Sequence, residues 1–579
     1  MGKKFSNAKT WDFLDKFRGT EFNGEWPTLA QLFEITAQRY PKRNAFTVFE
    51  PERITLTYEQ ALETIRSLAT WLREQGVKKG DRVVVSGKNS PEWAVVFFAV
   101  AFADGVAVPI DYALHDKEIE TLCNTAKPVF SFFDDERFAY FENLSKTNSN
   151  IGRVFSLNKN QAEKYVYNLK PQNRSFEKPT NTDEALAALL FTSGTTGNPK
   201  GVMLSHRNLV SDAYIAQTHM NLFHTDVFYA LLPLHHSYTL LAVLIETVSV
   251  GAEVVFGKSL AVTKMLSELK EGKITMLLGV PLLFNKLIAG IMKGIRQKGA
   301  VVYGLISALM GLSYGVKKLT GVNIGKKLFG SVLRQVGLDN IRVAICGGGP
   351  LAPSVFKKYN EFGVDFVQGY GLTETSPIVA LNPIEHFKIE SVGRYFHPYA
   401  EAKVINPDEN GVGELCFKGP MVMQGYYNMP EETRAMFTED GFLKSGDLGR
   451  IDDEYYVYLM GRAKNMIVTS GGKNVYPEEI ENAFQLFYND IEQITVKGWK
   501  TGHENSEEEV EAQIYISDNL YSTLALTRGE TESDKKAQEK VSEIVNDVNK
   551  NLQPYQRITK ITFLDKPLEM TTTQKVKRH

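Results

Sequence analysis

The chain has 579 residues, which is enough for several domains and a large buried core. Its composition, 43% apolar and 23% charged, is typical of a soluble globular protein, and the net charge of −2 gives no reason to expect nucleic-acid binding. The three cysteines, Cys123, Cys346 and Cys416, lie far apart. This spacing excludes a disulfide framework and a cysteine zinc site, and it fits a reducing compartment. The first residues lack an apolar core, so we expect no secretory signal.

The first part of the chain predicts alternating helices and strands. Helical spacing over residues 56–75 ends at Gly76, a short apolar strand follows at 82–86, an apolar helix at 93–103 and a strand at 106–110. Alternation of this kind, with short turns, is typical of α/β folds with a mainly parallel sheet.

The most informative stretch is residues 189–206, LLFTSGTTGNPKGVMLSH. A strand leads into a loop of small and hydroxyl residues, a lysine follows, and an apolar strand resumes. Glycine N–H groups and hydroxyls donate hydrogen bonds to an anion and the lysine adds positive charge, so the layout favours phosphate binding over a plain surface hairpin. It is not a Walker A loop, which needs Gly-Lys-Ser/Thr before a helix. The phosphate-binding candidates are Thr192, Ser193, Gly194, Thr195, Thr196, Gly197 and Lys200.

The segment TSGTTGNPKG resembles the signature loop of the adenylate-forming (AMP-binding) superfamily, which contains acyl-CoA synthetases, nonribosomal peptide adenylation domains and beetle luciferases. Segments similar to the other motifs of this superfamily follow in the same order over residues 57–575. The resemblance implies an α/β fold with two parts. Residues 1–463 would form a large N-terminal AMP-binding domain, layered α/β with a β-rich region over 392–460, and residues 464–579 a small, mobile α+β domain.

Two further strand ends carry candidate binding residues. The segment LPLHHSY ends an apolar strand with two histidines, and the resemblance implies that His236 borders the carboxylate and acyl site. A second strand, 341–346, is followed by three glycines and a proline, at the carboxyl end where open α/β sheets bind ligands. The nucleotide-binding candidates there are Gly347, Gly348, Gly349 and Pro350.

The segment QGYGLTET, residues 368–375, combines an aromatic ring, a hydroxyl and a carboxylate. It resembles the superfamily's adenine, phosphate and magnesium segment. Tyr370 offers a ring face to a base, and Glu374 offers the oxygen ligands that Mg²⁺ needs. The implied nucleotide-binding residues are Gln368, Gly369, Tyr370, Gly371 and Thr373, with Glu374 as metal ligand and catalytic residue.

Three residues mark the end of the large domain by resemblance. Asp447, in GDLG, is similar to the superfamily's ribose-binding aspartate, because a carboxylate can accept hydrogen bonds from both ribose hydroxyls. Arg462, in GRAKN, matches an arginine that holds ribose and the α-phosphate. Lys464 falls at the hinge position.

The last part of the chain is implied to contribute in two steps. The tail TTTQKVK resembles a Thr-x-x-Gly-Lys motif whose lysine catalyses adenylation, which places that role on Lys575, although Gln574 replaces the usual glycine. The segment with Gly472 and Lys473 is expected to reach the active site after rotation about the hinge, for thioester formation.

The reaction that the resemblance implies uses ATP, Mg²⁺ and coenzyme A. A fatty acid would be activated to acyl-AMP with release of pyrophosphate, and the thiol would then displace AMP to give acyl-CoA. The segments LPLHHSY and IVTSGGKNVYPEEIE look most like bacterial long-chain fatty acyl-CoA synthetases. An acyl carrier protein as the thiol acceptor is the first alternative.

Three other interpretations are less favoured. A nonribosomal adenylation module would need a carrier domain after residue 575, and a luciferase-like activity would need oxygen-dependent light emission. A catalytically silent, membrane-associated binding protein is disfavoured because five functional residues are all present: Lys200, Glu374, Asp447, Arg462 and Lys575.

Residues 285–338 contain nine lysines and arginines and no aspartate or glutamate, and residues 300–316 are uncharged. Three interpretations stay open: a buried helix with solvated basic flanks, a membrane-surface element, and a transmembrane helix, the last being least favoured. A membrane-surface element suits a lipid substrate, so we expect a cytoplasmic protein that contacts the inner face of a membrane peripherally through this segment.

Overall fold

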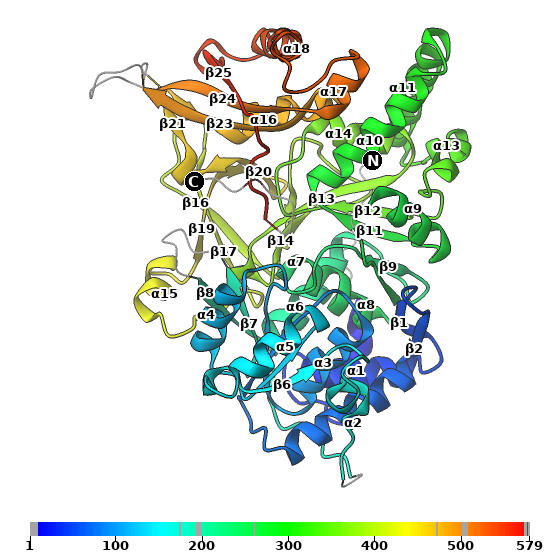
Figure 1. Ribbon diagram of the computed structural model, residues 1–579, viewed down its shortest axis with the longest axis vertical. Coiled ribbons are helices and arrows are strands. Elements are labelled where there is room, and N and C mark those ends of the chain that lie inside the picture. The colour runs from blue at the N-terminus through cyan, green and yellow to red at the C-terminus, as the bar shows by residue number, and fades with distance from the viewer. Residues whose placement is uncertain are drawn as a thin grey trace.

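The computed structural model describes residues 10–172, 175–192, 199–259, 261–469, 473–500, 508–571 and 576. Figure 1 shows a large body formed by the first three quarters of the chain, with a smaller lobe from the C-terminal part lying above it.

One sheet of the large body has seven strands within the described residues. Strands β3 to β7 pair in parallel, whereas β8 and β18 add in antiparallel fashion at one edge. The order across the sheet is β18 (Gly425–Tyr426), β8 (Lys200–Ser205), β7 (Leu186–Thr192), β4 (Val106–Pro109), β3 (Arg82–Ser86), β5 (Phe130–Phe133) and β6 (Arg153–Ser156).

A second sheet has thirteen strands in the described part of the chain. Its middle strands pair in parallel, as the sequence predicts, but from β13 onward the pairing is antiparallel, which confirms the β-rich region expected after residue 392. The order is β16 (Glu401–Ile405), β17 (Gly413–Lys418), β19 (Leu443–Ile451), β20 (Tyr456–Arg462), β15 (Gly393–Tyr395), β14 (Ile378–Leu381), β13 (Asp365–Gly371), β12 (Val343–Cys346), β11 (Met276–Gly279), β9 (Val227–Ala230), β10 (Glu253–Phe256), β1 (Asn44–Val48) and β2 (Ile54–Thr57).

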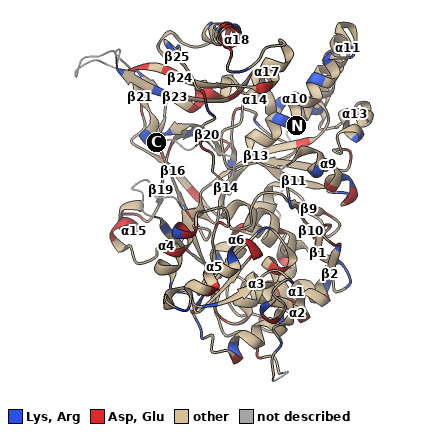
Figure 2. Cartoon of the chain, in the orientation of Figure 1, with Lys and Arg blue, Asp and Glu red and all other residues tan. Residues whose placement is uncertain are grey.

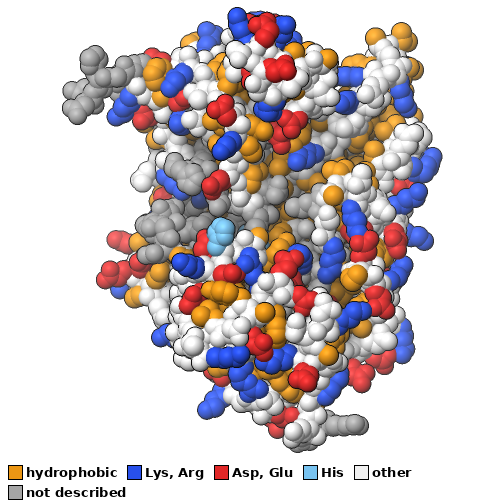
Figure 3. Space-filling view, in the orientation of Figure 1, with side chains coloured by type: hydrophobic (Ala, Val, Ile, Leu, Met, Phe, Trp, Pro, Cys, Tyr) orange, Lys and Arg blue, Asp and Glu red, His pale blue; other side chains and the backbone are white. Residues whose placement is uncertain are grey.

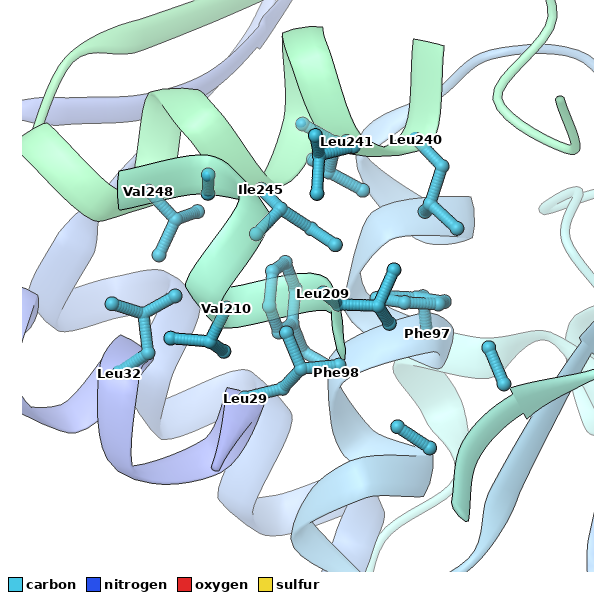
Figure 4. Close-up of a cluster of buried hydrophobic side chains, with 14 of the residues drawn as sticks. Leu29, Leu32, Phe97, Phe98, Leu209, Val210, Leu240, Leu241, Ile245 and Val248 are labelled. Atoms are coloured by element: carbon cyan, nitrogen blue, oxygen red, sulfur yellow. The ribbon is translucent and has the colours of Figure 1, made fainter. Parts of the chain in front are cut away.

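A layer of helices lies between the two sheets. Helix α3 (Pro91–Phe102) contacts both sheets and buries all of its side chains, because its sequence PEWAVVFFAVAF is apolar on every face. Figure 4 shows side chains of four helical segments meeting there: α1 (Leu29–Arg39), α3, α6 (His206–Ala216) and the segment that leads into α8 (Glu246–Val250). This core fixes the two sheets relative to each other.

Other helices cover the outer faces of the sheets. The seven-stranded sheet is covered by α4 (Asp116–Ala126) and α5 (Asp135–Leu144), and α2 (Tyr58–Glu74) packs beside α1 and α3. The outer helices of the larger sheet are α9 (Val262–Glu271), α10 (Pro281–Arg296), α11 (Ala300–Thr320), α12 (Gly325–Leu328), α13 (Gly330–Gln335) and α14 (Pro353–Glu361).

Helix α11 projects from the body (Figure 1). Of its side chains only Met310, Ser313 and Lys317 are buried, so the interpretation of residues 300–316 as a buried helix is wrong. Lys317 anchors the helix, because its Nζ donates to Asp365 Oδ1 at 2.6 Å and to Asn360 Oδ1 at 2.7 Å. By length and apolar composition α11 could cross a bilayer, and within the described residues no other helix could.

The C-terminal lobe has a sheet and a hydrophobic core of its own. Gln485 ties it to the large body, since its Nε2 donates to Pro350 O at 3.0 Å and its Oε1 accepts from Ala352 N at 2.8 Å. The elements of the lobe are α16 (Pro477–Ala483), β23 (Ile491–Lys500), β24 (Glu508–Ile516), α17 (Asp518–Thr523), α18 (Thr531–Asn549) and β25 (Lys560–Phe563), preceded by the hairpin β21 (Ile467–Val468) and β22 (Asn474–Val475).

Candidate active site

A cavity of about 670 Å³ lies where the strand ends of both sheets face the C-terminal lobe. The strands β7, β8, β12, β13, β19 and β20 each contribute to its wall, either directly or through the loop that follows them. Residues predicted from five separate motifs meet in this wall: Thr192, Lys200, His236, Gly347, Gly348, Gly369, Tyr370, Gly371, Thr373, Glu374, Arg462 and Lys464.

One cluster joins Tyr370, Asp447 and Arg462. The Tyr370 hydroxyl donates to Asp447 Oδ2 at 2.6 Å, and Arg462 Nε lies 2.7 Å from Asp447 Oδ1. Asp447 and Arg462 face each other across β19 and β20, so the sheet register sets this pair. Burial, reinforced by the Asp447 carboxylate, raises the pKa of Tyr370 well above its usual value and keeps its hydroxyl a donor.

A second cluster joins Glu374, Tyr426 and Lys200. The Tyr426 hydroxyl donates to Glu374 Oε1 at 2.8 Å, and Lys200 Nζ lies 4.7 Å from the centre of the Tyr426 ring. Tyr426 reaches this place because β18 pairs with β8 opposite Val202. Burial and the nearby carboxylate raise the pKa of Tyr426. Tyr426 was not predicted, and the only sequence signal for it is the GYY turn.

The two histidines form a third group. His236 lines the cavity, and His235 Nε2 lies 3.4 Å from Asp111 Oδ2. Asp111, His235 and His236 offer ligand atoms that all lie within 4.8 Å of one another. Asp111 follows β4 in the segment PID, whose chemistry the sequence did not reveal. The next residue, Ser237, places its Oγ 3.2 Å from Thr373 Oγ1 and so joins this group to the QGYGLTET segment.

Two glycines in the wall, Gly371 and Gly347, leave little room for a side chain. A Cβ on Gly371 would lie 1.7 Å from Pro377 O, and one on Gly347 would meet the Tyr238 ring at 3.0 Å. Gly348 has a φ of +77°, which disfavours other residues. The backbone of these strand ends therefore forms part of the binding surface itself.

Some predicted residues lie elsewhere or outside the described residues. Gly349 packs near Pro281, Gln368 is buried but does not line the cavity, and Lys473 is exposed in the hairpin of β21 and β22. Thr571 lines the cavity and shows that the C-terminal tail reaches it. The predicted residues outside the described part of the chain are Ser193, Gly194, Thr195, Thr196, Gly197, Gly472 and Lys575.

The cavity has an apolar branch, and the sequence did not show which residues form it. Its side chains come from the helical layer and from strands of both sheets, and most of them are buried. The branch carries a single carboxylate, Glu246. Its apolar lining residues are Leu190, Ala216, Met220, Phe228, Ala242, Ile378 and Leu381.

The donor set fits a nucleotide and a hard cation. Asp447 combines a carboxylate with a neighbouring guanidinium, and the flat Tyr370 ring stands beside glycine backbone. Glu374 Oε2 accepts no hydrogen bond from the described residues, so one oxygen is available to a metal ion that prefers oxygen ligands.

Comparison with known proteins identifies the family of this chain. A family model described as AMP-binding enzyme matches residues 33–427. The feruloyl-CoA synthase of an Amycolatopsis species is 27% identical over 434 residues, covering 74% of this chain and 77% of that protein. A long-chain-fatty-acid–CoA ligase of Salmonella typhimurium is 27% identical over 522 residues, covering 82% of this chain and 84% of that protein.

One further relative is named for a different thiol acceptor, and one solved structure has a similar fold. The chloroplastic long-chain-fatty-acid–[acyl-carrier-protein] ligase AEE15 of Arabidopsis thaliana is 26% identical over 556 residues, covering 82% of this chain and 75% of that protein. The structure of O-succinylbenzoate coenzyme A synthetase from Bacillus subtilis, with ATP and magnesium, superposes with a TM-score of 0.70 at 23% identity, over 94% of this chain and 98% of that one. Because the family model spans more than half of the sequence, this chain belongs to the AMP-binding enzyme family, the adenylate-forming superfamily that its motifs resemble.

Proposed function

We propose that this protein is an acid–thiol ligase that activates a long-chain fatty acid with ATP and transfers the acyl group to coenzyme A. The observation that carries the proposal is one cavity in which the clusters of Asp447 and Glu374 adjoin an apolar branch. A nucleotide, a metal ion and an aliphatic acid can therefore meet in a single site.

The polar clusters would hold ATP. Asp447 accepts the ribose hydroxyls, the Tyr370 ring covers the adenine, and Arg462 and Lys200 place positive charge near the phosphates. Thr192, Thr373, Gly347 and the other residues of the 192–201 loop would supply further donors. Mg²⁺, held by Glu374, would neutralise charge on the phosphates as pyrophosphate departs.

The C-terminal part would serve the two half-reactions in turn. We propose that residues 464–579 form a mobile domain that rotates about Lys464, so that Lys575 supports adenylation and the Gly472–Lys473 segment supports thioester formation. Two observations support this: Lys464 lines the cavity, and the lobe has its own hydrophobic core.

The apolar branch supports a fatty acid as the substrate. Each buried methylene group contributes about 0.8 kcal/mol, so a branch lined by aliphatic and aromatic side chains selects for chain length. Relatives named as long-chain-fatty-acid ligases favour the same substrate, while the feruloyl-CoA synthase shows that aromatic acids occur at similar identity. A carrier protein remains the alternative acceptor, because the Arabidopsis relative is named for one.

We also propose that α11 contacts the inner face of a membrane in a cytoplasmic protein. Val301, Leu305, Leu312 and Leu319 recur along one helix face and are 86%, 62%, 58% and 88% exposed. Figure 3 shows hydrophobic side chains at the upper right of the molecule, where α11 lies, and Figure 2 shows basic but no acidic side chains on α11. Apolar side chains flanked by lysines match an anionic bilayer surface.

The proposed reaction is tested by pyrophosphate release with ATP and Mg²⁺ over a panel of acids from acetate to oleate, with ferulate included, in the presence and absence of coenzyme A. We expect turnover that rises with aliphatic chain length and increases with coenzyme A. Preference for ferulate would contradict the fatty-acid assignment, and adenylation without transfer to coenzyme A would favour the carrier protein.

A further inference from the structure

A buried carboxyl group of the cavity wall, Glu246, has a second buried carboxyl group beside it. Glu246 lines the cavity with its side chain, although the residue is only 3% exposed. Asp212 of α6 lies next to it and is fully buried. Glu246 opens α8 directly after a π-helical segment, Leu240–Ile245, an irregularity that often marks functional positions in helices.

Neither carboxyl group is fully satisfied by the protein. No described residue makes a hydrogen bond of good geometry to either oxygen of Glu246 or to Asp212 Oδ1. Asp212 Oδ2 accepts from Ile378 N at 2.9 Å. Gln217 donates from Nε2 to Ser249 Oγ at 2.7 Å, and its side-chain amide also lies close enough to Glu246 for a hydrogen-bonding interaction that lowers the pKa of this carboxyl group.

The surroundings favour an uncharged Glu246. Burial raises its pKa well above the usual range, Asp212 raises it further, and no cation among the described residues offsets these effects. An uncharged carboxyl group can donate one hydrogen bond and accept others. It therefore suits a ligand hydroxyl, which also donates and accepts, better than an ammonium group, which needs an ionised carboxylate.

A purely structural acid pair is the simpler alternative. Two neighbouring carboxyl groups can share a proton and need no ligand. Such a pair has no reason to lie in the wall of a substrate cavity, where an apolar residue would complete the lining. A buried polar group without a partner is destabilising, so its place in the wall favours a partner supplied by the substrate.

We infer that Glu246 is a specificity-determining residue that hydrogen-bonds a hydroxyl group on the acyl chain, so that the preferred acid is a hydroxylated long-chain fatty acid. This inference rests on the proposed function and narrows its substrate class. His236 borders the predicted carboxylate site, and Glu246 follows it by ten residues in the helical segment Ser237–Val250, which is at most about 15 Å at 1.5 Å per residue. The hydroxyl is therefore expected near the middle of the chain and not beside the carboxylate.

The test compares kcat/KM for pyrophosphate release with octadecanoate, 2-hydroxyoctadecanoate, 12-hydroxyoctadecanoate and 12-aminododecanoate. We expect the 12-hydroxy acid to exceed octadecanoate by at least about tenfold and the 2-hydroxy acid to show no such gain. Equal kcat/KM values for 12-hydroxyoctadecanoate and octadecanoate would overturn the inference. A preference for 12-aminododecanoate would overturn it too. Absence of release with every acid would instead contradict the proposed function itself.

Two variants of Glu246 distinguish recognition of the acyl-chain hydroxyl from a purely structural role of this side chain. Glu246→Leu should remove the preference for the 12-hydroxy acid while plain octadecanoate is still used, and Glu246→Gln, which keeps the shape, should retain part of the preference. Glu268→Gln is the matched control, because Glu268 is equally buried but bonds Tyr229 outside the cavity. Equal losses for both acids in Glu246→Gln, with normal folding, would show a structural role and overturn the inference.

Discussion

The Tyr370–Asp447–Arg462 cluster shows how one carboxylate connects three strands, β13, β19 and β20, at the candidate nucleotide site. Asp447 accepts from Tyr370 and pairs with Arg462, so its removal leaves a buried hydroxyl and a guanidinium without their partner. We predict that Asp447→Ala lowers kcat/KM for ATP in pyrophosphate release by about a hundredfold or more.

Tyr370→Phe is the control for that prediction. It keeps the ring that would cover the adenine and removes only the hydroxyl, so the expected loss is about tenfold or less. If Asp447→Ala retained normal use of ATP, the nucleotide would not lie against this cluster.

Two buried histidines make stability depend on pH. Burial lowers the pKa of His206 to about 4, and its Nδ1 accepts from Leu29 N at 3.2 Å. Burial also lowers the pKa of His219 to about 3. Below pH 6.5 these two histidines bind protons in the unfolded chain but not in the folded chain, so their contribution to stability falls as the pH falls toward 4.

For His206 alone the loss is about 3 kcal/mol between pH 6.5 and pH 4. We predict that His206→Asn flattens the pH dependence of the urea midpoint over this range, whatever its effect at pH 7. His224→Asn is the control, because His224 is exposed and should leave the slope unchanged. If the urea midpoint of His206→Asn depended on pH as strongly as that of the wild type, His206 would not be a cause of the pH dependence.

Most side chains of helix α11 are not buried against other described parts of the chain. We predict that the protein cosediments with vesicles of phosphatidylcholine and phosphatidylglycerol, and that Leu305→Asp with Leu312→Asp weakens this binding by about tenfold or more. Added salt should weaken it too, because Lys298, Lys318 and Lys327 are exposed near the apolar face.

Leu524→Asp is the control for vesicle binding, since Leu524 is an exposed leucine of the C-terminal lobe. If Leu305→Asp with Leu312→Asp bound vesicles as well as the wild type does, membrane contact through α11 would be contradicted. Self-association of the wild type through this face, without vesicle binding, would identify a second copy as the partner instead.

The sequence predicted the elements that position the site better than it predicted their contacts. The strands before the 192–201 loop, the triglycine and QGYGLTET are present, and the helix predicted over residues 56–75 begins at Tyr58, capped by Thr57. Local patterns determine such elements because periodicity and capping act over a few residues. Residues 300–316 were ambiguous, since composition does not reveal whether a neighbour covers a helix.

The contacts that the sequence missed all join distant segments. Tyr426 meets Glu374 because β18 pairs with β8, Asp111 meets His235 from another strand, and Glu246 enters the cavity from the helical layer. Motif resemblance named residues that the superfamily shares, such as Asp447 and Arg462. It could not name side chains whose role depends on the packing in this chain.

The two parts of the chain should act in sequence if residues 464–579 rotate as proposed. Lys464 lies in the 3₁₀ turn Ala463–Asn465, between β20 of the large body and the hairpin of β21 and β22. We predict that Lys464→Pro lowers thioester formation while acid-dependent pyrophosphate release is largely retained, because proline restricts the backbone change that the second step needs. Equal losses in both half-reactions would exclude a hinge at Lys464.

The most direct test of the ligase assignment is mass spectrometry of the products from oleate, ATP, Mg²⁺ and coenzyme A. We predict that the wild type forms oleoyl-CoA and AMP in equal amounts, and that Glu374→Gln forms at most about a hundredth as much of each. Formation of ADP, or of AMP without any acyl thioester to coenzyme A or a carrier protein, would contradict an acid–thiol ligase that works through an acyl-adenylate.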